Sequence, residues 1–232
     1  MTLTEHPIVV RMSTLTQQWE EASDRRAIFL GCYTLMTRNM LAAIDAGRFH
    51  DGEWVGRLLR RFVDYYFDAL TLYDQASTDT PPVWKLTHDA THQDHVMTLQ
   101  HLLLGINAHI NNDLVFALYD LLAPEWAGLS EAGREQRHTD HTLVNHIIGE
   151  TVDSVQDQVI DRHAPWFKVI DKLMGPTDEW LTSHLIAHWR EEVWSNAVRY
   201  LALQDTRERD TFHQKIEVAA VRLGKEILGG IP

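Results

Sequence analysis

The sequence predicts an all-α protein that folds as a single-domain bundle of about seven helices. Apolar residues recur at three- and four-residue steps along most of the 232-residue chain, which is the spacing of a buried helical face. No stretch alternates apolar and polar residues as a half-buried strand does, and no fixed-period repeat is visible. Because 44% of the residues are hydrophobic, the chain can bury one sizeable core, which favours one domain.

Caps and helix breakers set the expected order of the elements. Residues 1–13 show no clear period and are expected to form a loosely docked arm, followed by the helical domain over 14–232. Gly47 is expected to end a helix, Pro82 to open one, and Asp51 and Asp140 to cap those that follow them. The expected helices cover residues 14–46, 53–76, 84–92, a central stretch ending near 122, 141–162, 165–175, 176–203 and 207–228.

Charge and composition narrow the classes of partner. The formal net charge is -12, the sequence pI is about 5.5, and there is no basic tract. Neither a nucleic acid nor a membrane surface is therefore expected as a partner, because both are bound through clustered Lys and Arg. We expect no secretory signal and no membrane span. The single cysteine permits no internal disulfide, so we expect a cytoplasmic protein that binds a small molecule or associates with itself as a homo-oligomer.

The central helix carries a carboxyl group where an apolar side chain is expected. Within the segment from Leu99 to Leu121, Asp113 lies near the middle of the apolar face. His109 lies one turn earlier on the same side, so the two side chains are spaced to share one metal ion. Because a lone carboxylate is costly to bury, Asp113 must meet a metal, a hydrogen-bond network or a basic partner.

A second pair with the same one-turn spacing occurs on the long C-terminal helix. His188 and Glu192 either complete a shell around zinc, iron or manganese or lie on a solvated flank of that helix. Two ligands on one helix are a weak pattern by themselves. The metal hypothesis therefore depends on whether the fold brings this pair to His109 and Asp113.

Other polar residues are candidates for substrate binding or acid–base chemistry. His141 and Asn145 lie one turn apart, and His141 is either a metal ligand or general base, or a half-exposed residue of a first helical turn. Arg190 lies within the apolar face of the long C-terminal helix. It is expected either to pair with Asp113 or to bind an anionic substrate. Asn107 lies at the edge of the central apolar face, where it can orient a substrate.

Two pairs of aspartates have the spacing used by prenyl-transfer enzymes to hold magnesium diphosphate. Asp64 and Asp68 form one pair, and Asp153 and Asp157 form the other. Both pairs lie opposite the apolar faces of their helices, which favours exposed ion pairs instead. A prenyl-diphosphate-using enzyme is therefore the least favoured hypothesis.

The segment Leu-Leu-Gly-Ile-Asn-Ala-His-Ile-Asn-Asn-Asp-Leu at 103–114 resembles the signature of the bacterial domain-of-unknown-function family 5995. The looser similarities extend over about 30–203 and lie at Phe62, Tyr66, Ala69, Trp84, Asp140, Asn145, Arg190, Trp194 and Ala197. The resemblance implies an all-helical bacterial protein and no established activity. The resemblance implies that the site positions of the family pattern correspond to Asn107, His109, Asp113, Asn145 and Arg190. His141, His188 and Glu192 are not clearly part of this pattern.

Two functions fit these residues. The first is a metal-assisted hydrolase of a small anionic substrate, in which the metal is bound by His109 and Asp113 with His141, His188 or Glu192, and the substrate by Arg190, Asn107 and Asn145. The alternative is a non-catalytic binding or self-associating module. In that case the buried His, Asp, Asn and Arg side chains form a network that fixes the register of the helices.

Overall fold

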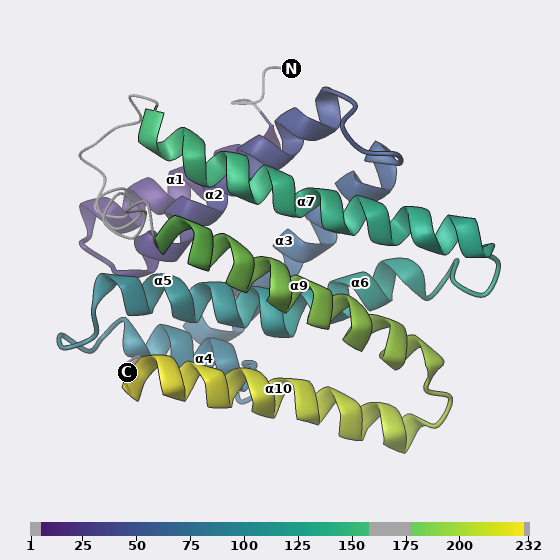
Figure 1. Cartoon of the computed structure of the whole chain (residues 1–232). Helices are drawn as coiled ribbons and strands as arrows, with labels where there is room; N and C mark the ends of the chain where they lie inside the picture. Colours follow the sequence, from purple (N-terminus) through teal and green to yellow (C-terminus); the bar gives the residue numbers. More distant parts are fainter. Residues whose placement is uncertain (1–5, 158–177, 230–232) are drawn as a thin grey trace.

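The computed structural model describes residues 6–157 and 178–229, and within these ranges the regular structure is entirely helical (Figure 1). The elements are α1 (Pro7–Glu21), α2 (Arg26–Asp45), α3 (Gly52–Asp74), α4 (Pro82–Ala90), α5 (Thr98–Asn107), the π-helix η2 (Ala108–Asp113), α6 (Leu114–Leu122), α7 (Glu131–Asp157), α9 (Asp178–Ala202) and α10 (Thr206–Gly229). Because α5, η2 and α6 follow one another without a break, they form one rod. Eight helices are then described, which confirms the all-α prediction; about seven were expected.

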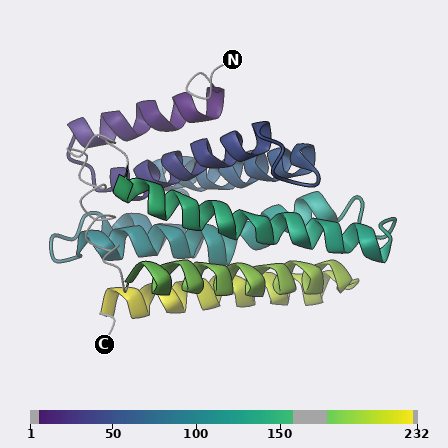
Figure 2. The same ribbon diagram turned by 45° about the horizontal axis from the view of Figure 1, so that its top comes forward.

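The helices stack in layers with roughly aligned axes (Figure 2). α1 packs on α2 at one side of the molecule, and α9 and α10 lie at the other side. The rod of α5, η2 and α6 lies between these layers and contacts α2, α3, α4, α9 and α10. The helix that carries His109 and Asp113 is therefore at the centre of the bundle.

The N-terminal segment differs from the expected arm. Residues 7–13 belong to α1, and Val9 and Met12 of this segment are buried in the core. The expected helix over 14–46 is in fact divided between α1 and α2. The chain turns at Ser23, whose φ of 56° is left-handed, and the Asp24 carboxylate accepts a hydrogen bond from the backbone N–H of Arg26. This local turn interrupts a segment whose apolar period suggested one continuous helix.

Asp140 caps a different helix from the one expected. α7 begins ten residues earlier than predicted, at Glu131, with the Ser130 hydroxyl accepting from the backbone N–H of Gly133. Asp140 thus lies inside α7, where it is fully buried, and its carboxylate accepts from the backbone N–H groups of His50 at 2.7 Å and Asp51 at 2.9 Å. The carboxylate secures the chain entering α3, an interaction between helices that local sequence does not specify.

The other predicted caps and stops agree with the structure. The Asp51 carboxylate accepts from the backbone N–H of Trp54 at 2.8 Å and so caps α3. Gly47 follows the end of α2 with a φ of 68°, and Pro82 is the first residue of α4. The expected helix over 165–175 and the end of the one expected over 141–162 lie outside the described residues.

One described helix, α2, is long and apolar enough to pass a simple test for a membrane span. In the bundle, 61% of its most apolar window is buried. Seven of its side chains line an internal cavity, namely Phe29, Cys32, Tyr33, Leu35, Met36, Thr37 and Met40.

Candidate functional site

The 103–114 segment spans the point at which the central rod changes from an α-helix to a π-helix. A π-turn accommodates an extra residue, is rare, and is found frequently at functional sites. Four of the six residues of η2 are buried, namely Ala108, His109, Asn112 and Asp113. The π-turn therefore directs three polar side chains into the interior of the bundle.

Asp113 is paired with three neutral donors. Its Oδ2 atom lies 2.9 Å from Nε1 of Trp84 and 3.1 Å from Nδ1 of His109, and its Oδ1 atom accepts from Nδ2 of Asn112 at 3.0 Å. Only 1% of the residue is exposed. The carboxyl group is thus satisfied by α4 and η2, and Arg190 is not among its partners.

His109 is held between Asp113 and aromatic rings. It stacks on Phe62 with 3.5 Å between ring centroids, and it meets Tyr33 edge-on at 4.4 Å. Burial lowers the pKa of His109 below its usual value, although Asp113 acts in the opposite direction, so the ring is neutral at neutral pH. A neutral ring that donates its Nδ1–H to Asp113 has a lone pair on Nε2, and this atom has no hydrogen-bond partner among the described residues.

Arg190 forms a second buried group, separate from Asp113. Its Nε donates to Oδ1 of Asn145 at 2.8 Å, and its Nη2 donates to the backbone carbonyl oxygen of His141 at 2.7 Å. Burial lowers the pKa of Arg190 to about 10, so the guanidinium stays charged at neutral pH. Within the described part of the chain no carboxylate lies at ion-pair distance from it.

His141 is buried within α7 and does not lie half-exposed in a first helical turn as one reading predicted. Its Nε2 lies 3.0 Å from the backbone carbonyl oxygen of Arg190, and its Nδ1 lies 3.3 Å from Nη2 of the same residue. Burial and the charge of Arg190 hold the pKa of His141 well below its usual value. The neutral ring therefore connects α7 to α9 through hydrogen bonds.

A cavity of about 200 Å³ joins the two groups, because both His109 and Arg190 line it. Its wall comes from α2, α3, the central rod, α7 and α9, and is almost entirely apolar. Five of the eight predicted site residues thus form two separate clusters, and one residue of each cluster, His109 and Arg190, lines the cavity.

Three of the predicted site residues belong to neither cluster and do not line the cavity. His188 and Glu192 are exposed on α9, with 3.6 Å between Nε2 and Oε1, so they do not join His109 and Asp113. Asn107 is fully buried and donates to the backbone carbonyl oxygen of Ala220 at 2.9 Å, which fastens the rod to α10. Among the side chains that the structure describes, in residues 6–151 and 184–229, no group of three or more His, Cys, Asp or Glu residues is placed to hold a metal ion.

The prenyl-transfer pattern gains no support from the first aspartate pair. Asp64 and Asp68 are exposed on α3, as expected from their position opposite the apolar face. The side chains of Asp153 and Asp157 lie outside the described residues. For this second pair the pattern stays a prediction.

Sequence reasoning missed several residues of the site. Trp84 donates to Asp113 from another helix, and an isolated tryptophan gives no indication of its partner. Tyr33 and Thr37 line the cavity with hydroxyl groups that have no partner among the described residues. The only available signal was their position on the apolar face of α2.

Comparison with known proteins gives one match. The profile of a family described as Family of unknown function (DUF5995) matches residues 6–230. No curated protein and no solved structure matches the chain.

Proposed function

The chain belongs to the family of unknown function DUF5995, and from the geometry of its interior we propose that it binds a small, largely apolar carboxylate. The apolar body of the ligand would occupy the cavity, and its carboxylate would meet Arg190. One observation carries this proposal: a buried, charged arginine at the wall of an apolar cavity has no acidic partner among the described residues.

The guanidinium, which has no acidic partner among the described residues, favours an anion over a neutral ligand. A buried charge is costly unless it is paired, and hydrogen bonds between Arg and a carboxylate are stronger than those between neutral groups. Two nitrogen atoms of Arg190 have protein partners, whereas Nη1 donates to no described residue. An incoming carboxylate would supply both the missing charge and an acceptor.

The size and lining of the cavity limit the apolar part of the ligand. A cavity of roughly 150 Å³ binds benzene, so the 200 Å³ found here suits a molecule of about ten non-hydrogen atoms. Aromatic and thioether side chains form much of the wall, among them Phe29, Phe62 and Met36. Phenylacetate and octanoate fit this description and are suitable probes.

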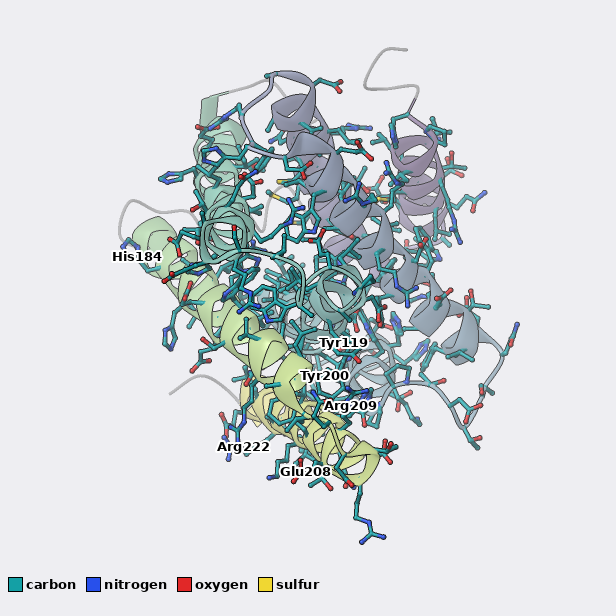
Figure 3. The ribbon with its side chains drawn as sticks, turned by 90° about the vertical axis from the view of Figure 1, so that its right-hand side faces the viewer. Tyr119, His184, Tyr200, Glu208, Arg209 and Arg222 are labelled. Atoms are coloured by element: carbon teal, nitrogen blue, oxygen red, sulfur yellow. The ribbon has the colours of Figure 1, made fainter. Side chains whose placement is uncertain are left out.

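Binding of phenylacetate and of neutral 2-phenylethanol, measured by isothermal titration calorimetry, tests the proposal. We expect the carboxylate to bind at least about tenfold more tightly, since a charged hydrogen-bonded pair contributes roughly 1.5–3 kcal/mol. Arg190→Met should remove this preference, and Arg190→Lys should keep part of it. Arg222→Met is the matched control, because Arg222 is exposed on the outer side of α10 (Figure 3).

Two results would contradict a carboxylate site. The first is equal affinity of the wild-type protein for the acid and the alcohol. The second is an unchanged preference in a folded Arg190→Met protein, with folding checked by circular dichroism.

The His109–Asp113 pair favours a second candidate function, an enzyme acting on the bound molecule. A neutral imidazole oriented by a buried carboxyl group is an arrangement used in general-base catalysis, and it is also the start of a metal shell. Elemental analysis of protein purified without chelator, with Asp113→Ala alongside, distinguishes these roles. One equivalent of zinc, iron or manganese that is lost in the variant would support a metal-assisted hydrolase, and equal trace amounts would contradict it.

A further inference from the structure

Three side chains of the cavity wall carry buried polar atoms that have no hydrogen-bond partner among the described residues. These atoms are the Tyr33 hydroxyl, the Thr37 hydroxyl and Nε2 of His109. Tyr33 and Thr37 lie one turn apart on α2, and the Tyr33 ring meets that of His109 with 4.4 Å between centroids. Because most buried polar atoms in proteins are paired, several unpaired ones around one cavity indicate a missing polar group.

Tyr33 and His109 offer complementary hydrogen-bonding roles. His109 Nε2 is an acceptor, because the single proton of the neutral ring is directed to Asp113. Burial raises the pKa of Tyr33 well above its usual value, so its hydroxyl keeps its proton and can donate. A neighbouring donor and acceptor together match a hydroxyl group, which both donates and accepts.

Resting on the carboxylate site proposed above, we propose that the ligand carries a hydroxyl group on its apolar body and that Tyr33 and His109 recognise it. Both side chains line the cavity, and their polar atoms have no hydrogen-bond partner among the described residues. Phe29, Tyr33 and Phe62 supply rings to the wall, and aromatic side chains pack well with one another in offset and edge-on arrangements. The ligand class is therefore a hydroxyphenyl carboxylate.

Asp113 is a positioning residue in this proposal. It fixes the proton of His109 on Nδ1, so that Nε2 remains an acceptor. An Asp113→Asn side chain that directs its amide group to Nδ1 moves the ring proton to Nε2, and it also removes the acceptor of Trp84 Nε1, because both donors share Oδ2. Nitrogen-15 NMR of the His109 ring reports this change of tautomer directly, independently of any ligand.

The test compares the dissociation constants of phenylacetate and its ortho-, meta- and para-hydroxy derivatives. We expect one isomer to bind about tenfold or more tightly than phenylacetate, as the pairing of otherwise unsatisfied buried groups predicts. Tyr33→Phe should bring that isomer to within about threefold of phenylacetate, because one of the two contacts is lost. This variant removes an unpaired hydroxyl and no hydrogen bond, so folding is preserved.

Tyr119→Phe is the matched control for the loss of a phenolic hydroxyl. Tyr119 on α6 packs against Tyr200 on α9, with 4.5 Å between ring centroids, and does not line the cavity (Figure 3). The control should bind all four probes as the wild-type protein does.

The outcomes separate this inference from the proposed function. If phenylacetate binds through Arg190 and no hydroxy isomer binds more tightly, hydroxyl recognition is overturned and the carboxylate site stands. If the preference for one isomer survives in Tyr33→Phe and in Asp113→Asn, these residues do not provide it. If none of the four acids binds, both proposals fail.

Discussion

The Asp113 carboxyl group joins two segments of the fold. It accepts from Trp84 of α4 and from His109 and Asn112 of η2. Each of these donors is buried, so each depends on the same carboxyl group for its hydrogen bond. At the scale of single residues, this group is the point at which the central rod and α4 are held in register.

Asp113→Ala should destabilise the protein strongly. The change leaves three buried donors without an acceptor, at about 1–3 kcal/mol each, so we expect the free energy of unfolding to fall by roughly 3 kcal/mol or more. Urea denaturation followed by circular dichroism measures this loss. Asp64→Ala, at an exposed position of α3, is the control and should change stability by less than about 0.5 kcal/mol. A loss of under about 1 kcal/mol in Asp113→Ala would show that the donors find other partners.

Arg190→Met should separate a ligand site from a structural network. Replacing the buried guanidinium with an apolar side chain leaves the acceptors on Asn145 and His141 unpaired, but it also removes a buried charge that lacks an acidic partner among the described residues. These two effects oppose each other, so the unfolding free energy of the ligand-free protein should change by less than about 1 kcal/mol. Chemical denaturation without ligand measures this change. A loss above about 2 kcal/mol would instead show that the hydrogen bonds of Arg190 to Asn145 and His141 hold the helices together.

Some roles of single residues can be predicted from nearby sequence, and others cannot. The inward position of Asp113 and the caps at Gly47 and Asp51 follow from periodicity and turn chemistry, which act over a few neighbouring residues. The pairing of Asp113 with Trp84, rather than with Arg190, depends on how separate helices are arranged. Several pairings satisfy the same burial pattern, so the sequence left them open.

At the scale of elements, α2 and α5 cross at a glycine. A Cβ atom added to Gly105 would lie 2.3 Å from Cγ of Phe29, which is too close for any real contact. Phe29 also lines the cavity, so this crossing helps to set the shape of the proposed ligand site. The close approach of α2 and α5 at Gly105 therefore determines where Phe29 lies in the cavity wall.

Gly105→Ala and Gly149→Ala should have opposite effects on stability. Overpacking at the crossing should cost Gly105→Ala about 1–3 kcal/mol, because Phe29 has to shift. Nothing lies within 4 Å of a Cβ atom added to Gly149 in α7, so that variant should gain about 0.5–1 kcal/mol from helix propensity. Thermal unfolding of both variants checks the signs, and a stability of Gly105→Ala equal to that of the wild-type protein would contradict the packing argument.

The π-turn explains why a helical wheel described the site incompletely. A wheel at a constant 100° per residue holds for an α-helix, whereas η2 winds more slowly over Ala108–Asp113. The constant angle correctly placed Asp113 inside, but it gave no sign that Asn112 is also buried. Similarly, Asp140 looked like a local cap because the distant backbone it binds, at His50 and Asp51, cannot be seen in the sequence.

At the scale of the whole molecule, four histidines that are buried among the described residues influence how stability responds to acid. Burial lowers the pKa of His88 to about 3 and that of His101 to about 4, and it lowers the pKa values of His109 and His141 as well. All four rings are neutral in the folded protein at neutral pH. His88 lies in a polar segment with His92 and His95, which favours a solvated face, yet only 3% of it is exposed.

Stability should therefore fall as the pH drops below about 6.5, where unfolded histidine binds a proton. Between this pH and about 4, the unfolded chain holds more protons than the folded one, so the free energy of unfolding decreases by up to about 1.4 kcal/mol per pH unit for each histidine. Above neutral pH these histidines are neutral in both states, so they do not make the free energy of unfolding depend on pH. Urea denaturation at a series of pH values over this range measures the slope.

His88→Phe assigns part of that slope to one residue. Neither ring nitrogen of His88 has a hydrogen-bond partner among the described residues, and the ring stacks on Trp84, so phenylalanine can take its place without losing a contact. Below about pH 6.5 the unfolded wild-type chain binds more protons than the folded one. In His88→Phe this difference should be smaller by up to one proton, so the free energy of unfolding should fall less steeply with decreasing pH. His188→Gln, on the exposed side of α9, should leave the slope unchanged. A slope that is equal in His88→Phe and the wild-type protein would mean that the buried ring accepts its proton without unfolding.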